Sequence, residues 1–176
     1  MSVKPVVRGA RILVVDDEPV RQALPVGDYG MFYDSLASYG SWFSTPTYGY
    51  VWQPATVHRS GWRPYWDGRW VCTDSGWTWM SDEPFGWACY HYGRWALLRG
   101  HGWVWIPGDQ WAPAWVCWRS SGSHIGWAPL PPETMGWRDC RWDATVETRF
   151  GIGSGWFTFV ASTSFCSPIR SFCVPI

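Results

Sequence analysis

The residue types that most often carry protein chemistry, cysteine and histidine, are few and scattered along this chain. Six cysteines stand at positions 72, 89, 117, 140, 166 and 173. Cys72, Cys89 and Cys117 each follow a tryptophan by two residues, which in a strand puts the thiol and the indole on one face. If two of these strands are neighbours, a disulfide is geometrically possible, and an even cysteine count favours bridges in an exported protein. Buried free thiols are the alternative.

A zinc site would need a ligand spacing that this sequence does not offer. The best candidate is Cys89-x-His91, with His58, His101 or His124 as further ligands. Structural zinc sites are typically built from paired Cys-x-x-Cys ligands, and metalloproteases from His-Glu-x-x-His. Neither pattern occurs in the chain. We therefore predict no metal and no other cofactor.

Groups for acid–base or nucleophilic catalysis form no recognisable pattern either. Asp82 and Glu83 are adjacent, but they precede Pro84 in a predicted turn, where acidic residues are common because turns are solvated. The Gly-x-Ser-x-Gly nucleophile elbow is absent, and no Cys/His pair carries a known signature. The sequence therefore predicts a protein that is not an enzyme.

Aromatic and arginine side chains offer a binding chemistry instead. Sugar rings stack on exposed tryptophan and tyrosine faces, while polar side chains at the edge bind hydroxyl groups. The candidate aromatic platform combines residues that alternate away from the main tryptophan positions with the arginines of two Gly-Arg-Trp copies: Tyr65, Trp66, Arg69, Tyr90, Tyr92 and Arg94. In the alternative interpretation, these arginines only cap tryptophan faces through cation–π contacts.

A tryptophan repeat in the sequence indicates the secondary-structure elements that position these residues. The pattern Gly61-Trp62, Gly68-Arg69-Trp70, Gly76-Trp77-Thr78-Trp79 recurs as Gly86-Trp87, Gly93-Arg94-Trp95, Gly102-Trp103-Val104-Trp105, so that matching tryptophans are 25 or 26 residues apart. Looser copies end at Trp52 and at Trp127. Between residues 40 and 130 there are fifteen tryptophans but only ten leucines, isoleucines and valines, so the indole rings must form most of the core.

Each repeat is predicted to form short antiparallel strands joined by tight turns. Asp67-Gly68 indicates a two-residue hairpin turn, and Asp74-Ser75-Gly76 a second one. Trp77 and Trp79 are two residues apart and so share a strand face, as do Trp103 and Trp105. About nine short strands are expected between residues 50 and 127. The predicted fold class is therefore all-β, an antiparallel meander of hairpins, with barrel or sandwich closure left open.

The chain divides into three predicted segments. Residues 1–28 form an N-terminal tail, poorly packed or flexible, and residues 29–135 form the tryptophan-repeat domain. Residues 136–176 form an extension that packs on the same domain. Phe32 and Leu36, four residues apart, indicate one short helix before Gly40.

Charge and hydropathy limit the partners. Fourteen basic and fourteen acidic residues cancel, which argues against nucleic acid as a partner because that surface needs a basic excess. No apolar run approaches the roughly 18 residues of a membrane helix, so we expect no membrane span. The N-terminal residues as written contain no secretory signal peptide. The oligomeric state is not indicated.

Four stretches carry a resemblance to a known family: GWRPYWDGRW (61–70), GWTWMSDEPFGWACYHYGRW (76–95), GWVWIPGDQWAPAWVCW (102–118) and GWAPLPPE (126–133). Over roughly residues 30–176 the chain resembles a tryptophan-rich bacterial family of unknown function. Many of its members are predicted to be secreted or envelope proteins, some with a FecR-type region upstream. The resemblance implies an extracytoplasmic location, in the periplasm or at the cell surface, and it supplies no catalytic residues.

Two functions follow as expectations. The first is a non-catalytic structural or protein-interaction module of the bacterial cell envelope, whose partner is an envelope protein. The alternative is a glycan- or peptidoglycan-binding module that uses exposed aromatic rings.

Overall fold

The structure is a computed structural model, and it describes residues 12–13, 30–132 and 144–169. Its strands are β1 (Ile12–Leu13), β2 (Gly40–Thr45), β3 (Gly49–Pro54), β4 (Gly68–Thr73), β5 (Gly76–Ser81), β6 (Arg94–Leu98), β7 (Gly102–Ile106), β8 (Val116–Ser121), β9 (His124–Pro129) and β10 (Thr158–Ala161). The α-helices are α1 (Gly30–Leu36), α2 (Gly86–Cys89) and α3 (Ala144–Phe150). Single 3-10 turns are η1 (Ala55–His58), η2 (Ser154–Trp156) and η3 (Ser162–Ser164).

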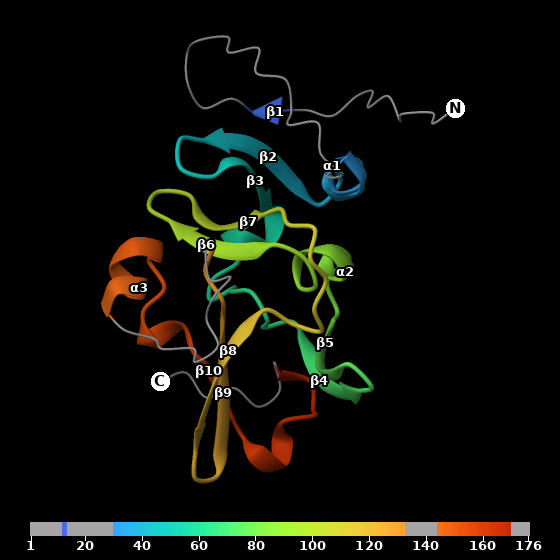
Figure 1. Cartoon of the computed structure of the whole chain (residues 1–176), viewed down its shortest axis with the longest axis vertical. Helices are drawn as coiled ribbons and strands as arrows, with labels where there is room; N and C mark the ends of the chain where they lie inside the picture. The colour runs from blue at the N-terminus through green and yellow to red at the C-terminus, as the bar shows by residue number, and fades with distance from the viewer. Residues whose placement is uncertain (1–11, 14–29, 133–143, 170–176) are drawn as a thin grey trace.

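The strands of the described residues form three open sheets and no closed barrel. The largest has the order β1-β2-β3-β7-β6, the second has the order β10-β9-β8, and the third is the β4-β5 hairpin. All pairings are antiparallel except that of β1 with β2. The largest sheet lies at one end of an elongated molecule and the β8-β9-β10 sheet at the other, with β4-β5 to one side (Figure 1). The predicted all-β class and the short helix before Gly40 are confirmed.

The tryptophan repeat corresponds to one β-hairpin per unit. In each of four successive hairpins, two tryptophans stand directly opposite each other on the paired strands. The pairs are Trp42 with Trp52 in β2-β3, Trp70 with Trp79 in β4-β5, Trp95 with Trp105 in β6-β7, and Trp118 with Trp127 in β8-β9. Directly opposed aromatic residues stabilise a hairpin by about 0.2–1 kcal/mol per pair. The repeat therefore places an indole pair at the centre of every hairpin.

The two faces of the largest sheet bury different side chains. Trp52 also pairs with Trp105, so the indoles of two hairpins form one continuous row across β2, β3, β7 and β6. Smaller buried residues occupy the opposite face: Phe43, Val51, Ala96 and Val104. This alternation follows from the two-residue period of a strand. As predicted, Trp103 and Trp105 share the aromatic face while Val104 points away.

Indole N–H groups tie irregular backbone to the sheets. Five of the paired tryptophans donate from Nε1 to a backbone carbonyl outside the strands, over distances of 2.8–3.3 Å. The acceptors are the carbonyls of Tyr33, Leu36, Tyr65, Cys89 and Tyr92. A buried carbonyl without a donor is costly, and an aliphatic side chain cannot supply one. The indoles thus fill the core, and their N–H groups also provide hydrogen bonds to backbone carbonyls of the surrounding loops and short helices.

Burial confirms that tryptophan forms the core. Among the sixteen tryptophans in the described residues, nine are buried: 42, 52, 62, 70, 79, 95, 103, 105 and 127. They join one cluster that includes residues of all three sheets. Their rings meet mainly edge-to-face or tilted, as in the Trp70–Trp79 pair at 5.1 Å and 66°.

Two predicted details of the β region are wrong. Asp67-Gly68 is not a hairpin turn, because Gly68 begins β4 opposite Ser81, and a side chain at Gly68 would collide with the Met80 carbonyl and the Trp79 ring. Between residues 49 and 129 there are seven strands rather than about nine, since residues 55–58 and 86–89 are helical turns. Pro84 lies directly before Phe85, the N-cap of α2.

The outer segments are described only in part. Of the predicted tail, residues 1–28, only the β1 residues are described, and the expectation of poor packing concerns residues that lie outside the description. In the C-terminal segment, β10 pairs with β9 from Thr158 opposite Trp127 to Ala161 opposite His124. No helix of the described residues is long and apolar enough to cross a membrane.

Candidate functional site

Two members of the predicted aromatic platform, Tyr65 and Tyr90, are core residues. Their side chains are fully buried, and their rings lie 4.7 Å apart. The Tyr65 hydroxyl donates to the Tyr90 carbonyl at 3.0 Å and accepts from the Trp115 backbone N–H at 3.0 Å. Burial raises the pKa of both hydroxyls. Neither ring can stack on a ligand, so the platform of six residues is not formed.

The remaining aromatic and basic members of that platform lie on different elements. Trp66 is partly buried, with the Arg63 guanidinium 4.6 Å from its ring centroid. Tyr92 packs at 5.2 Å against Phe32 of α1. Arg69 is exposed on β4, opposite Met80 of β5. Alternation along the sequence missed this separation, because Trp66 and Tyr92 lie outside the strands, where a two-residue period does not indicate which way a side chain points.

The three cysteines considered for a cross-strand disulfide lie on separate elements. Cys72 is exposed on β4, Cys117 is buried on β8 of another sheet, and Cys89 is buried in α2. The structure records no disulfide between any two of these three. Burial raises the pKa of the Cys89 thiol well above its ordinary value. The prediction that each thiol shares a strand face with the tryptophan two residues before it fails at Cys89, because Trp87 and Cys89 are in α2. Cys140 and Cys173 lie outside the described residues.

The histidines also lie apart. His91 Nδ1 is 3.0 Å from the Ala112 carbonyl, and its ring stacks on Trp111 at 5.8 Å. His101 stacks on Phe43 at 5.0 Å. Within the described residues, no three histidine, cysteine or acidic side chains come together in a group that could hold a metal ion.

The structure also contains a buried carboxylate, a kind of group common in active sites, which the sequence did not indicate. Glu83 was expected in a solvated turn, but it is only 8% exposed. Its Oε1 accepts from Trp62 Nε1 at 2.7 Å and from Thr56 Oγ1 at 3.4 Å, and its Oε2 accepts from the Tyr90 hydroxyl. Burial raises the pKa of Glu83, against the lowering effect of these hydrogen bonds. The one feature of the sequence that could have indicated its burial is the position of this acidic residue within a very aromatic stretch.

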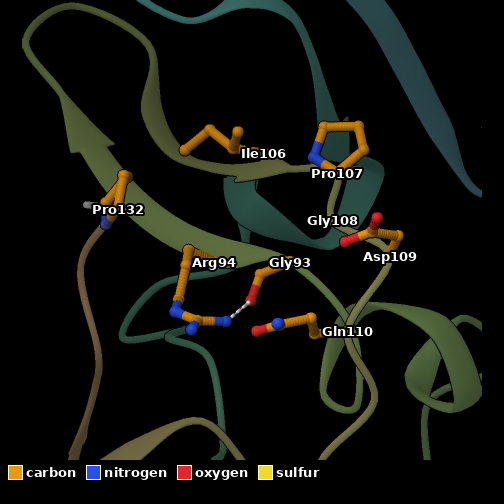
Figure 2. Close-up of a pocket in the computed structure, with 8 residues that line it drawn as sticks. All are labelled: Gly93, Arg94, Ile106, Pro107, Gly108, Asp109, Gln110 and Pro132. Atoms are coloured by element: carbon orange, nitrogen blue, oxygen red, sulfur yellow. Dashed lines mark hydrogen bonds between the residues drawn. The ribbon is translucent and has the colours of Figure 1, made fainter. Parts of the chain in front are cut away.

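Arg94 lines a surface hollow of about 180 Å³ at the start of β6 (Figure 2). The other lining residues come from the preceding glycine, from the end of β7 with the loop after it, and from Pro132: Gly93, Ile106, Pro107, Gly108, Asp109 and Gln110. Gly93 has a φ of +63°, and a Cβ at Gly108 would lie 2.9 Å from the Gly93 Cα atom. Two glycines therefore let the two backbone segments approach closely at this hollow.

The Arg94 guanidinium is held firmly, and no described residue forms an ion pair with it. Its carbon lies 3.3 Å from the centroid of the Trp115 ring, and Nη1 donates to the Gly93 carbonyl at 2.7 Å. Nε is buried without a hydrogen-bond partner, and the structure gives Arg94 no ion pair among the described residues. Burial lowers the pKa of Arg94 to about 10, so the side chain stays charged at neutral pH. The cation–π interpretation of this arginine agrees with the geometry.

A second hollow, of about 340 Å³, lies between the loop before β4 and the segment that follows α3. Glycines 61, 151, 153 and 155 line it, together with Arg63, Glu147 and Trp156. The Arg63 guanidinium is 6.0 Å from the Trp156 ring centroid, and the Trp156 ring packs edge-on against Trp103 at 5.2 Å. The lining of this hollow therefore combines a cation, a carboxylate and an indole with four glycines.

Three further indoles are exposed to solvent. Trp77 on β5 is 43% exposed, Trp87 in α2 is 44% exposed, and Trp111 in the loop after β7 is 49% exposed. Each is nevertheless held by a ring contact: Trp77 with Phe165 at 4.8 Å, Trp87 with Phe32 at 5.8 Å, and Trp111 with His91. Large apolar rings held at a surface are available for contact with a partner.

Within the described residues, these features define the class of protein: an all-β domain of tryptophan-paired hairpins, with an aromatic core, surface hollows and exposed indoles. Over residues 33–134, more than half of the chain, it matches a family described as a family of unknown function, DUF6600, and it belongs to that family. No curated protein and no solved structure matches the chain.

Proposed function

We propose that the protein is a non-catalytic protein-interaction module of the bacterial cell envelope. The observation that carries the proposal is the set of exposed indoles, Trp77, Trp87 and Trp111, fixed on a core that is complete without them. Tryptophan is among the residue types enriched in the side chains that dominate the binding energy of protein interfaces. Envelope location rests on the family resemblance alone.

The position of Glu83 supports a non-catalytic role. It is the described carboxyl group whose pKa is raised by burial, as an active-site acid would require. However, the groups around it are the core side chains of Trp62, Thr56 and Tyr90, and it lines neither hollow. A substrate would have to displace the core to reach it. Glu83 is better explained as a hydrogen-bond acceptor that organises the core.

Site-specific photo-crosslinking in bacterial cells tests the proposal. A photoreactive phenylalanine analogue replaces Trp87 in one variant and exposed Arg99, in the β6-β7 turn, in the control. We expect a discrete protein adduct in the envelope fraction from position 87 and none from position 99. Identical adduct patterns at both positions, or recovery of the protein from the cytoplasm alone, would contradict the proposal.

Glycan binding is the second candidate, and the hollow at Trp156 favours it. Arg63 and Glu147 place charged hydrogen-bonding groups there beside the indole of Trp156, and the four glycines add no side chains to the lining. Soluble peptidoglycan fragments should then shift the NMR signals of Gly153 and Trp156, and the Trp156→Ala variant should lose binding. Trp77→Ala is the control, because Trp77 lies on β5 and does not line this hollow. Equal binding by both variants would refute this candidate.

A further inference from the structure

The hollow beside Arg94 has a lining of mixed chemistry that the exposed indoles do not share. Arg94 contributes a cation, Asp109 a carboxylate and Gln110 an amide, while Ile106, Pro107 and Pro132 contribute apolar surface. In Figure 2, the Gln110 side chain points toward Arg94, and the Asp109 carboxylate lies near Gly108. A volume of about 180 Å³ is below the roughly 300–1,000 Å³ of sites for drug-sized ligands, so the space suits a single amino-acid residue.

From this juxtaposition we propose that the hollow binds one amino-acid residue with a free α-carboxylate and an apolar side chain. The α-carboxylate lies against Arg94, the α-nitrogen donates to Asp109, and the side chain contacts Ile106, Pro107 and Pro132. Two sources share this chemistry: a free amino acid and the carboxyl terminus of a peptide. The proposal is independent of the protein-interaction function, because none of Trp77, Trp87 and Trp111 lines the hollow.

The state of Arg94 is the first argument. Arg94 has no ion pair among the described residues, and its Nη2 makes no hydrogen bond with them, so this nitrogen retains its donors for an anion. A half-buried cation is stabilised by an opposite charge that is itself desolvated. The planar guanidinium presents a fork of donors that matches a carboxylate.

Pre-organisation is the second argument. The guanidinium face is fixed on Trp115, and Trp115 in turn donates from Nε1 to the His91 carbonyl at 3.0 Å. The Gly93 carbonyl holds Nη1 from the other direction. An arginine already fixed in one orientation loses little side-chain entropy on binding, which improves the affinity of a small ligand.

The repeat supplies a matched comparison. Arg69 occupies the same place in the other Gly-Arg-Trp copy, but it is exposed on β4 and lines neither hollow. The difference arises because residues 107–110 and Trp115 lie beside Arg94, whereas Arg69 projects from an open hairpin. Binding at Arg94 is therefore a property of tertiary packing and not of the motif.

Calorimetric titration of the full chain tests the proposal with three probes: valine, N-acetyl-valine and N-acetyl-valinamide. We expect saturable binding of the first two in the millimolar range and none of the amide, which lacks the carboxylate. Arg94→Gln should weaken binding at least about tenfold, while Arg69→Gln leaves it unchanged. Asp109→Asn, at an exposed position that does not threaten folding, should weaken binding of valine more than that of N-acetyl-valine.

The probes also distinguish the two sources of the ligand. Tighter binding of valine assigns the hollow to free amino acids, and tighter binding of N-acetyl-valine assigns it to peptide carboxyl termini. Equal binding of the amide, equal loss in the Arg94→Gln and Arg69→Gln variants, or no saturable binding of either acid by the wild-type protein would overturn the proposal. None of these results bears on the photo-crosslinking at position 87.

Discussion

Replacing Trp79 or Trp127 by phenylalanine separates two roles of a buried indole in this fold. Both side chains are almost completely buried, and each is one member of a cross-strand tryptophan pair. Trp127 Nε1 donates to the Tyr65 carbonyl at 3.1 Å, whereas Trp79 Nε1 has no hydrogen-bond partner in the described residues. The two substitutions therefore remove the same volume, but only one of them removes a hydrogen bond.

The structure sets the expected magnitudes. A vacated volume of about 40 Å³, at about 24 cal/mol per Å³ and with the lost transfer free energy, costs about 1–2 kcal/mol in either variant. In Trp127→Phe the Tyr65 carbonyl, in a buried loop residue with a φ of +60°, also loses its donor. An unsatisfied buried acceptor adds about 1–3 kcal/mol. We expect the Trp127 variant to be less stable than the Trp79 variant by about 2 kcal/mol.

Chemical denaturation followed by far-ultraviolet circular dichroism measures this difference without relying on the indole fluorescence that the substitutions alter. The free energy of unfolding is obtained by linear extrapolation, and equal slopes show that the two variants unfold to similar states. Equal destabilisation, or a larger loss for Trp79→Phe, would refute the idea that indole N–H groups hold the irregular backbone in place.

Three further outcomes follow from the structure. Because burial raises the pKa of Glu83 above 4.5, the protonated form is favoured in the fold, and wild-type stability falls as the pH rises from 4.5 through the raised pKa. Thermal unfolding from pH 4 to pH 8 should show Glu83→Gln gaining on the wild type by up to about 1.4 kcal/mol per pH unit within that window. Gly93→Ala should lower stability by at least about 2 kcal/mol, since φ is +63° and the new Cβ meets a backbone carbonyl, and Gly100→Ala, with φ +84° and open space around it, should cost less in the same denaturation assay. Iodoacetamide labelling read by mass spectrometry should modify Cys72 in the native protein and Cys89 only after denaturation, because Cys89 is buried with a raised thiol pKa.

The hairpins were predictable because their signal is local. Tryptophans at a fixed spacing, glycines beside them and turn residues between them determine strand pairs without reference to the rest of the chain. The sequence thus predicted the all-β class, the helix before Gly40, and the shared faces of Trp77 with Trp79 and of Trp103 with Trp105. It failed at residues 86–89, where a Gly-Trp step that matches Gly61-Trp62 begins a helical turn after Pro84.

The candidate sites were much less predictable. Spacing alone grouped Tyr65 and Tyr90 with Arg94 as one exposed platform, although the two tyrosines are in the core. It also assigned Glu83 to a solvated turn. Each error concerns a residue outside the strands, where no periodicity indicates which side of the chain faces the core.

By itself, the sequence determined that this chain folds into short antiparallel hairpins with a tryptophan core, since pairing within a hairpin depends on residues only about ten positions apart. Only the tertiary structure decided how the hairpins are assembled into three sheets, which indoles remain at the surface, and why Arg94 lines a hollow while Arg69 does not. The physical reason is that burial of a side chain depends on contacts between distant segments. Here those contacts are made largely by indole rings and by their N–H groups bonded to the backbone of other repeats.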